Sequence, residues 1–83
     1  MSNDEIKAIV LRAISDIAPE ADLAHLDPTV DVREQLDIDS MDSLNIMIAI
    51  HEATGVDIPE ADYPLMNTLN ACVVYLARKL RRV

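Results

Sequence analysis

Apolar residues recur every three or four positions in the first part of the chain, the spacing of one face of an α-helix. Ser2 and Glu5 have the spacing of a capping box, in which each side chain binds the other residue's backbone N–H at the start of a helix. Because Pro19 cannot continue a helix, the pattern predicts a helix over residues 3–18. Its apolar stripe consists of Ile6, Ile9, Val10, Ala13, Ile14 and Ile17.

The segment over residues 19–38 has no sustained period and contains six acidic residues. Connections of this length without structure are uncommon in compact domains. We therefore expect an ordered loop that wraps against the core, with a helical turn near Val32–Leu36. Isolated apolar side chains are expected to anchor this loop, namely Leu23, Leu26, Val30, Val32, Leu36 and Ile38.

A second helix is expected over residues 39–54. Asp39 is a favourable N-cap, and Asp42 lies in the first turn, where a carboxylate interacts well with the helix dipole. Gly55 follows the last helical residue and readily adopts the left-handed conformation that ends many helices.

The C-terminal part of the chain predicts one short and one long helix. A short acidic segment at residues 58–63, limited by Pro59 and Pro64, has room for about one or two helical turns. The last helix is expected to begin with Asn67 as its N-cap and to end in basic residues that suit its C-terminal dipole. Its buried face consists of Leu69, Cys72, Val73, Leu76 and Leu80, and its basic end of Arg78, Lys79, Arg81 and Arg82.

These elements predict an all-α fold: a small antiparallel four-helix bundle of three main helices and one short helix, with a long loop after the first helix. The bundle is expected to be a single domain over residues 1–83. The only aromatic residues are Tyr63 and Tyr75, and an aliphatic interior suits packed helices better than a sheet. A chain of 83 residues makes one modest core and leaves little room for a deep, enclosed active site.

The second helix carries two apolar faces separated by polar residues. One face consists of Ile46, Met47 and Ile50, and the other of Met41, Leu44 and Ile48. Because a small domain has a single core, we expect one face to be buried and the other to be exposed beside Asp39, Asp42 and Glu52. An exposed apolar patch among carboxylates indicates a protein-docking surface. Alternatively, the long loop folds over the second face and buries it.

Charge narrows the range of partners. Fifteen acidic residues against seven basic ones give a net charge of −8 and a pI near 4.4. Such a chain is repelled by phosphate backbones and anionic lipid headgroups, which excludes nucleic-acid binding and favours protein partners with basic patches. No apolar run reaches the roughly 20 residues of a membrane span. The chain does not open with a basic and then apolar signal segment, and its single cysteine suits a reducing compartment, so we expect a cytoplasmic protein.

The remaining reactive side chains are expected to be structural. Cys72 lies on the buried stripe of the last helix, where a small core residue is expected. His25 and His51 are isolated and lack the spacing of metal ligands, so we expect no metal site.

The start of the second helix holds the candidate chemistry. The sequence Asp-Ser-Met-Asp at residues 39–42 places the hydroxyl of Ser40 in the first helical turn. An anion attached there would lie over free backbone N–H groups and the positive end of the helix dipole. By itself this tetrapeptide is also typical of an ordinary helix start.

Three segments in order, however, resemble the acyl carrier proteins. Residues 36–44 are similar to the family's Asp-Ser-Leu-Asp region, residues 55–60 to its Ile-Pro-acid stretch, and residues 73–76 to its Val/Ile-x-Tyr-Ile/Leu stretch. The resemblance covers nearly the whole chain. It implies that Ser40 Oγ is the attachment point of a 4′-phosphopantetheine arm, which a separate phosphopantetheinyl transferase adds from coenzyme A.

The resemblance also implies a function, that of a carrier rather than an enzyme. The protein would hold acyl chains as thioesters on the arm and present them to acyl-transferring and condensing enzymes with basic patches, in fatty acid, lipid or polyketide-type biosynthesis. A bound acyl chain would find shelter in the aliphatic interior between the second and last helices. The partner-binding residues would be Asp39, Met41, Asp42, Leu44, Ile48 and Glu52.

The chain departs from the family along the second helix. Asn45, His51 and Ala53 stand where the family often has glutamates, and Thr54 stands where it has an aromatic residue. These differences favour a specialised carrier over a general fatty acid carrier. Two alternatives stay open: a carrier of amino acids or hydroxy acids, and an unmodified acidic helical adaptor. Asp39 speaks against the peptidyl carriers, which usually have glycine before the serine.

Overall fold

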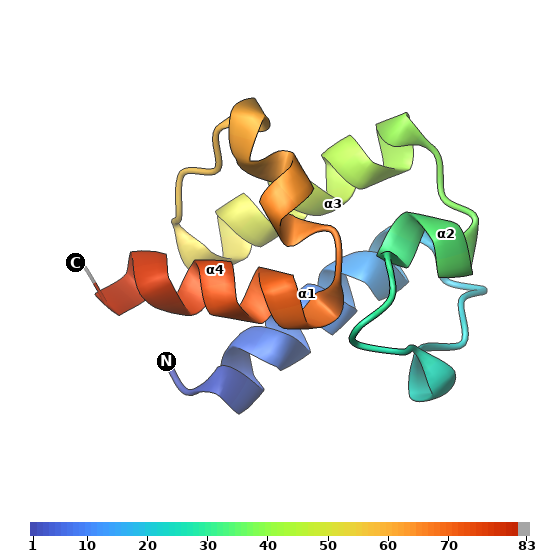
Figure 1. The fold of residues 1–83 in the computed structure, drawn as a ribbon, viewed down its shortest axis with the longest axis horizontal. Coiled ribbons are helices and arrows are strands. Elements are labelled where there is room, and N and C mark those ends of the chain that lie inside the picture. Colours follow the sequence, from blue (N-terminus) through green and yellow to red (C-terminus); the bar gives the residue numbers. More distant parts are fainter. Residues whose placement is uncertain (82–83) are drawn as a thin grey trace.

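The computed structural model describes residues 1–81, and all the regular secondary structure in that range is helical (Figure 1). In Figure 1, the first long helix leads away from the N terminus, and the other two run back toward it. The first helix packs against both of the others. This arrangement confirms the predicted all-α bundle. The long helices are α1 (Asn3–Ile17), α3 (Ser40–Thr54) and α4 (Leu69–Arg81), and the short ones are α2 (Val32–Leu36) and the 3₁₀ helices η1 (Leu23–His25) and η2 (Glu60–Met66).

The ends of α1 follow from local chemistry. The predicted capping box is present: Ser2 Oγ accepts the backbone N–H of Glu5 at 3.2 Å, and Glu5 Oε1 accepts that of Ser2 at 3.1 Å. The helix ends at Ile17, one residue earlier than predicted. Ala18 has left the helical conformation, with φ −126° and ψ 72°, because the residue before a proline is disfavoured in the α region.

The core is aliphatic and lies where α1, α3 and α4 meet. No charged or polar side chain is buried within the described chain. Burying each large aliphatic side chain contributes about 1.5–3 kcal/mol, so these residues supply most of the driving force for folding. On α4, Val73 and Leu80 of the predicted stripe are only half-buried. Ala77, which the predicted stripe did not include, is buried. The most completely buried side chains are Ile6, Val10, Ile14, Ile50 and Leu76.

The long connection between α1 and α3 is ordered, as predicted, and is fastened to the start of α4. The backbone N–H of Val32 donates to the carbonyl of Asn67 at 2.8 Å, and that of Asn70 donates to the carbonyl of Pro28 at 3.0 Å. The expected turn forms as α2. Val30 was expected to be an anchor and is instead exposed. Polar contacts replace it, because Gln35 Nε2 donates to the carbonyl of Val30 at 3.0 Å and holds the loop there.

Two predictions for the C-terminal part were wrong in detail. The short helix was placed at residues 58–63, whereas η2 begins later and passes through Pro64, whose fixed φ suits a 3₁₀ helix. The N-cap of α4 is Thr68 rather than Asn67, since Thr68 Oγ1 accepts the backbone N–H of Ala71 at 3.0 Å. Asn67 has helical φ and ψ and closes η2. Arg82, expected in the basic end, lies outside the described residues.

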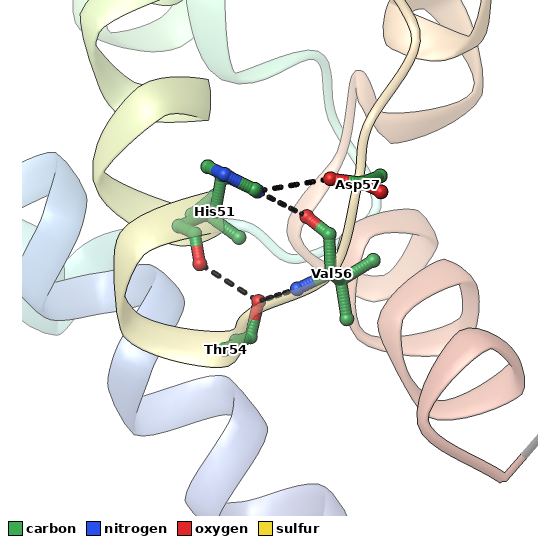
Figure 2. Close-up of polar contacts among 5 residues, drawn as sticks. His51, Thr54, Val56 and Asp57 are labelled. Carbon is green, nitrogen blue, oxygen red and sulfur yellow. Dashed lines mark hydrogen bonds and ion pairs between the residues drawn. The ribbon is translucent and has the colours of Figure 1, made fainter. Parts of the chain in front are cut away.

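Figure 2 shows how the end of α3 is joined to the segment that follows it. Gly55 takes the predicted left-handed conformation with φ 73°. Thr54 Oγ1 donates to the carbonyl of Ile50 at 2.8 Å and accepts the backbone N–H of Val56 at 3.2 Å. His51 Nδ1 donates to the carbonyl of Val56 at 2.7 Å. These bonds hold the C-terminal end of α3 in place, with Thr54 at the position where the resemblance leads one to expect an aromatic residue.

Candidate functional site

Ser40 is the first residue of α3, and its position is fixed by the residue before it. Asp39 is extended, with φ −89° and ψ −179°, and its Oδ1 accepts the backbone N–H of Asp42 at 2.8 Å. Its main-chain carbonyl accepts the N–H of Ser43 at 3.0 Å, the first bond of the helix. Asp39 is therefore the N-cap, as predicted, and Ser40 occupies the first helical position.

The chain reaches this helix from α2 through a short turn. Asp37 takes the left-handed conformation with φ 54°, which aspartate tolerates better than most residues. Ile38 is buried, whereas Asp37 and Asp39 on either side of it are exposed. One side chain thus fixes the turn to the core, and Ser40 is exposed directly after it.

The start of α3 suits a bound anion. In an α-helix, the N–H groups of the first residues have no acceptor within the helix. In α3 the N–H of Asp42 is bound by Asp39 Oδ1, which leaves those of Ser40 and Met41 for an anion. They lie at the positive end of the helix dipole. A phosphodiester joined to Ser40 Oγ would lie close to these donors, so the residues present fit a phosphopantetheine arm.

The second apolar face of α3 is exposed, which decides between the two interpretations of the sequence. Met41, Leu44 and Ile48 have 65%, 39% and 45% of their surface exposed. The opposite face, made of Ile46, Met47 and Ile50, is buried in the core. The loop that precedes α3 does not cover the exposed face. We use the name α3 face for the exposed residues together with the nearby acids: Asp39, Met41, Asp42, Leu44, Ile48 and Glu52.

A cleft of about 590 Å³ opens beside Ser40 and reaches the core. Its polar rim includes Arg33, Ser43, Glu60 and Asn67, which come from four different elements or connections. No local pattern in the sequence relates these residues. The one available signal is that Arg33 is the single lysine or arginine between Arg12 and Arg78. The floor of the cleft is apolar and includes Val10, Ile14, Ile46, Met47, Met66 and Cys72.

Cys72 is structural, as predicted. Its thiol is buried and donates to the carbonyl of Met66 at 3.0 Å. Burial raises the pKa of Cys72 from 9.0 to about 12, so the thiolate that would react is strongly disfavoured. Cys72 is the single cysteine of the sequence, so a reactive thiol at this site would have to come from outside the chain.

The sequence also predicted neither a metal site nor a membrane-spanning helix. His25 and His51 bind carboxylate or carbonyl oxygens of nearby residues. Among residues 1–81, no three side chains of metal-binding type gather into one group. No helix in that range is both long and apolar enough to cross a membrane.

Comparison with known proteins identifies the family. A model of the phosphopantetheine attachment site matches residues 6–76. A curated protein named acyl carrier protein, from Thermosynechococcus vestitus, is 28% identical over an alignment of 81 positions that covers 93% of this chain and 89% of the relative. The chain therefore belongs to the acyl carrier protein family, whose members carry phosphopantetheine covalently on a serine. It is a carrier protein and not an enzyme.

Two substitutions at Asp39 separate its capping role from its charge. Asp39→Ala removes the acceptor for the Asp42 N–H and is expected to lower the free energy of unfolding by about 1 kcal/mol. Asp39→Asn keeps an acceptor, so its free energy of unfolding is expected to fall by about half as much or less. Urea denaturation followed by circular dichroism measures both. Equal losses in the two variants would contradict the assignment of Asp39 as a hydrogen-bonding cap.

Proposed function

We propose that Ser40 is the residue that carries the phosphopantetheine arm, in a single carrier domain over residues 1–83. The observation that carries the proposal is the exposed hydroxyl at the first position of α3. Among the other serines, Ser2 also lies at a helix start, but its hydroxyl is bound to Glu5 and it precedes the region that matches the family. Ser15 lies within α1, and Ser43 lies one turn into α3 and is half-buried.

The residues present indicate which chemical steps belong to the chain, to the arm and to the transferase. The arm, when bound, supplies a thiol that holds an acyl group as a thioester. Ser40 holds the arm at the surface, and the start of α3 provides N–H groups that stabilise its phosphate. Cys72 cannot compete for acyl groups because its thiol is buried and protonated. The base that activates Ser40 is expected on the transferase.

The α3 face is the surface on which partner enzymes are expected to dock. It combines exposed apolar side chains with carboxylates directly beside Ser40. Its expected partners are the phosphopantetheinyl transferase and acyl-transferring and condensing enzymes with basic patches, in a cytoplasmic pathway of fatty acid, lipid or polyketide-type biosynthesis. The net charge of −8 speeds the approach of such basic surfaces.

Ser40→Ala tests the attachment residue. The full chain is incubated with coenzyme A and a phosphopantetheinyl transferase of broad specificity, and its intact mass is measured. The wild-type protein is expected to gain the mass of one phosphopantetheine, and Ser40→Ala to gain none. Ser43→Ala is the matched control, since it removes the next hydroxyl of the same helix and should still be loaded. Failure of the wild-type protein to gain mass would favour the unmodified adaptor, and loading of Ser40→Ala would place the arm elsewhere.

The cleft beside Ser40 is the expected shelter of a bound acyl chain. The sequence placed this shelter between α3 and α4, whereas Cys72 is the one residue of α4 among the described residues that line the cleft. It lies on the same side of α3 as the serine and has an apolar floor. Two of the floor residues are Met47 and Met66, whose flexible side chains adapt to an inserted chain. An acyl group that moves from water into this cleft buries apolar surface at about 25 cal/mol per Å².

This shelter predicts that cargo stabilises the protein. The octanoyl form is expected to melt about 2–5 °C above the unmodified protein, because a ligand that binds only the folded state stabilises it. The acetyl form is the matched control, since it has the same arm but too little chain to fill the cleft. Melting followed by circular dichroism gives the three temperatures. Equal temperatures for the octanoyl and acetyl forms would show that the chain stays outside.

A specialised rather than general carrier is supported by the distribution of charge on α3. Asn45 and Ala53 are exposed and uncharged where the family often has glutamates. His51, at a third such position, binds the carbonyl of Val56 and lies 3.8 Å from Asp57 Oδ1. The helix therefore presents a more apolar surface, with its acids near the two ends.

The specialised role is tested by competition for the general enzymes of fatty acid synthesis. This protein is expected to be loaded and elongated poorly when a general carrier competes with it. Asn45→Glu with Ala53→Glu should improve its use several-fold, because the two carboxylates add attraction to basic partner surfaces. The matched control places two glutamates on α1, at the exposed and uncharged positions Ala8 and Ser15, and so makes the same change in net charge. Efficient turnover of the wild-type protein would rule out the specialised role.

A further inference from the structure

A second surface, chemically unlike the α3 face, lies between η2 and α4. A groove of about 540 Å³ runs along this junction. No residue of α3 lines it, and Ser40 does not reach it. The helix η2 separates it from the cleft, because Tyr63 and Met66 line the cleft whereas Leu65 lines the groove. We use the name η2–α4 groove for the surface made by Leu65, Ala71, Val74, Tyr75, Arg78 and Lys79.

The centre of the groove is apolar and exposed. Leu65 and Val74 have 60% and 50% of their surface in contact with solvent. On α4, Ala71, Tyr75 and Lys79 follow one another at intervals of four residues and so lie along one face of the helix. Exposed apolar side chains that gather around one depression are typical of a protein-binding surface.

The floor of the groove is held in a fixed arrangement. Tyr75 Oη donates to Asp62 Oδ2 at 2.6 Å, which joins α4 to η2. Lys79 Nζ lies 5.4 Å from the centre of the Tyr75 ring, within range of a cation–π interaction. Asp62, the one acid at the groove, is thus already bound to the tyrosine hydroxyl. A surface ordered in advance loses little conformational entropy when a partner binds.

The charge of this surface is opposite to that of the rest of the molecule. All fifteen acidic residues lie at or before Asp62, whereas α4 carries Arg78, Lys79 and Arg81 and no acid. In the part of the chain that the structure describes, the only ion pairs involve His25 and His51, so no lysine or arginine is neutralised by an internal carboxylate. Basic residues at a helix C terminus favour its dipole, but this does not account for the exposed Leu65 and Val74 beside them.

We propose that the η2–α4 groove docks a helix of a partner protein whose apolar residues are flanked by carboxylates. The apolar stripe of that helix packs between Leu65 and Val74, and its carboxylates meet Arg78 and Lys79. The net charge of −8 slows the approach of an acidic partner, but screening over about 8 Å at physiological salt lets the local basic cluster dominate once contact is made. We therefore expect a dissociation constant on the order of 0.1–1 mM for an isolated helix.

The position of the groove gives this contact a role. Because the groove shares no residue with the α3 face, a partner bound there leaves Ser40 and the α3 face free. An acidic partner would hold the carrier in an assembly while basic enzymes visit the α3 face.

The test is a titration of the full-length, isotope-labelled protein with two synthetic helical peptides, followed by amide chemical shifts. One peptide has a leucine stripe flanked by glutamates, and in the other every glutamate is replaced by lysine. The glutamate peptide is expected to shift amides around Leu65, Val74 and Arg78 and to leave the α3 face unchanged. Arg78→Glu with Lys79→Glu should weaken its binding about tenfold. Lys7→Glu with Arg12→Glu makes the same charge change on α1 and should leave binding unchanged.

Leu65→Ser is a second variant that keeps every charge, and it is expected to fold because Leu65 is exposed. It should weaken binding about threefold or more. Several results would overturn the proposal: no shifts at millimolar glutamate peptide, shifts on the α3 face alone, equal shifts of the groove amides with the lysine peptide, or equal binding by Leu65→Ser. Shifts of the α3 face with the lysine peptide are expected, because that face favours basic partners. Two further results would overturn the proposal. Shifts of the groove amides with protein concentration alone would identify a second copy of the chain as the occupant. A response of these amides to phosphatidylglycerol vesicles but not to the peptide would identify a lipid surface.

Discussion

The arrangement of this carrier depends on the hydrogen bond from the Asp42 N–H to Asp39 Oδ1, which fixes the residue at which α3 begins. Once the start of a helix is fixed, each later side chain lies about 100° further around the axis. The cap therefore places Ser40 at the first helical position, and burial of Ile46, Met47 and Ile50 in the core sets which apolar face is turned inward. A helix that began one residue later would leave Ser40 outside the first turn, away from the N–H groups that suit its phosphate.

One side of α3 contributes to stability, and the other is free for function. The buried face belongs to an aliphatic core shared with α1 and α4, in which no polar side chain needs a partner. The exposed face carries apolar residues that add little to stability, together with carboxylates near the helix ends. Core size limits a domain of this length. A covalent arm added from outside gives such a domain reactive chemistry that its own buried thiol cannot supply.

Much of this architecture could be read from the sequence because it depends on local interactions. The capping box of Ser2 and Glu5, the cap at Asp39 and the left-handed Gly55 each need only neighbouring residues, and each was predicted correctly. The two faces of α3 followed from helical geometry and the limit of one core. The cap of α4 was misplaced by one residue: Thr68 is the cap, and the adjacent Asn67 instead accepts the N–H of the distant Val32 with its carbonyl.

The features that sequence reasoning missed are those formed by segments far apart in the chain. The rim of the cleft joins Arg33, Glu60 and Asn67, which no local pattern relates. The exposure of Val30 depends on bonds from Gln35 that replace apolar anchoring. The groove beside α4 is lined by Leu65 of η2 and Val74 of α4, on two elements that the bond between Tyr75 and Asp62 joins.

The central claim, that the hydroxyl at the start of α3 bears the prosthetic group, is tested most directly on protein purified from its native host. Trypsin is expected to release residues 34–78 as one peptide, because no lysine or arginine lies between Arg33 and Arg78. Fragmentation of this peptide by mass spectrometry distinguishes Ser40 from Ser43. The account predicts phosphopantetheine on Ser40 alone. Phosphopantetheine on Ser43, or native protein that carries no modification at all, would contradict it.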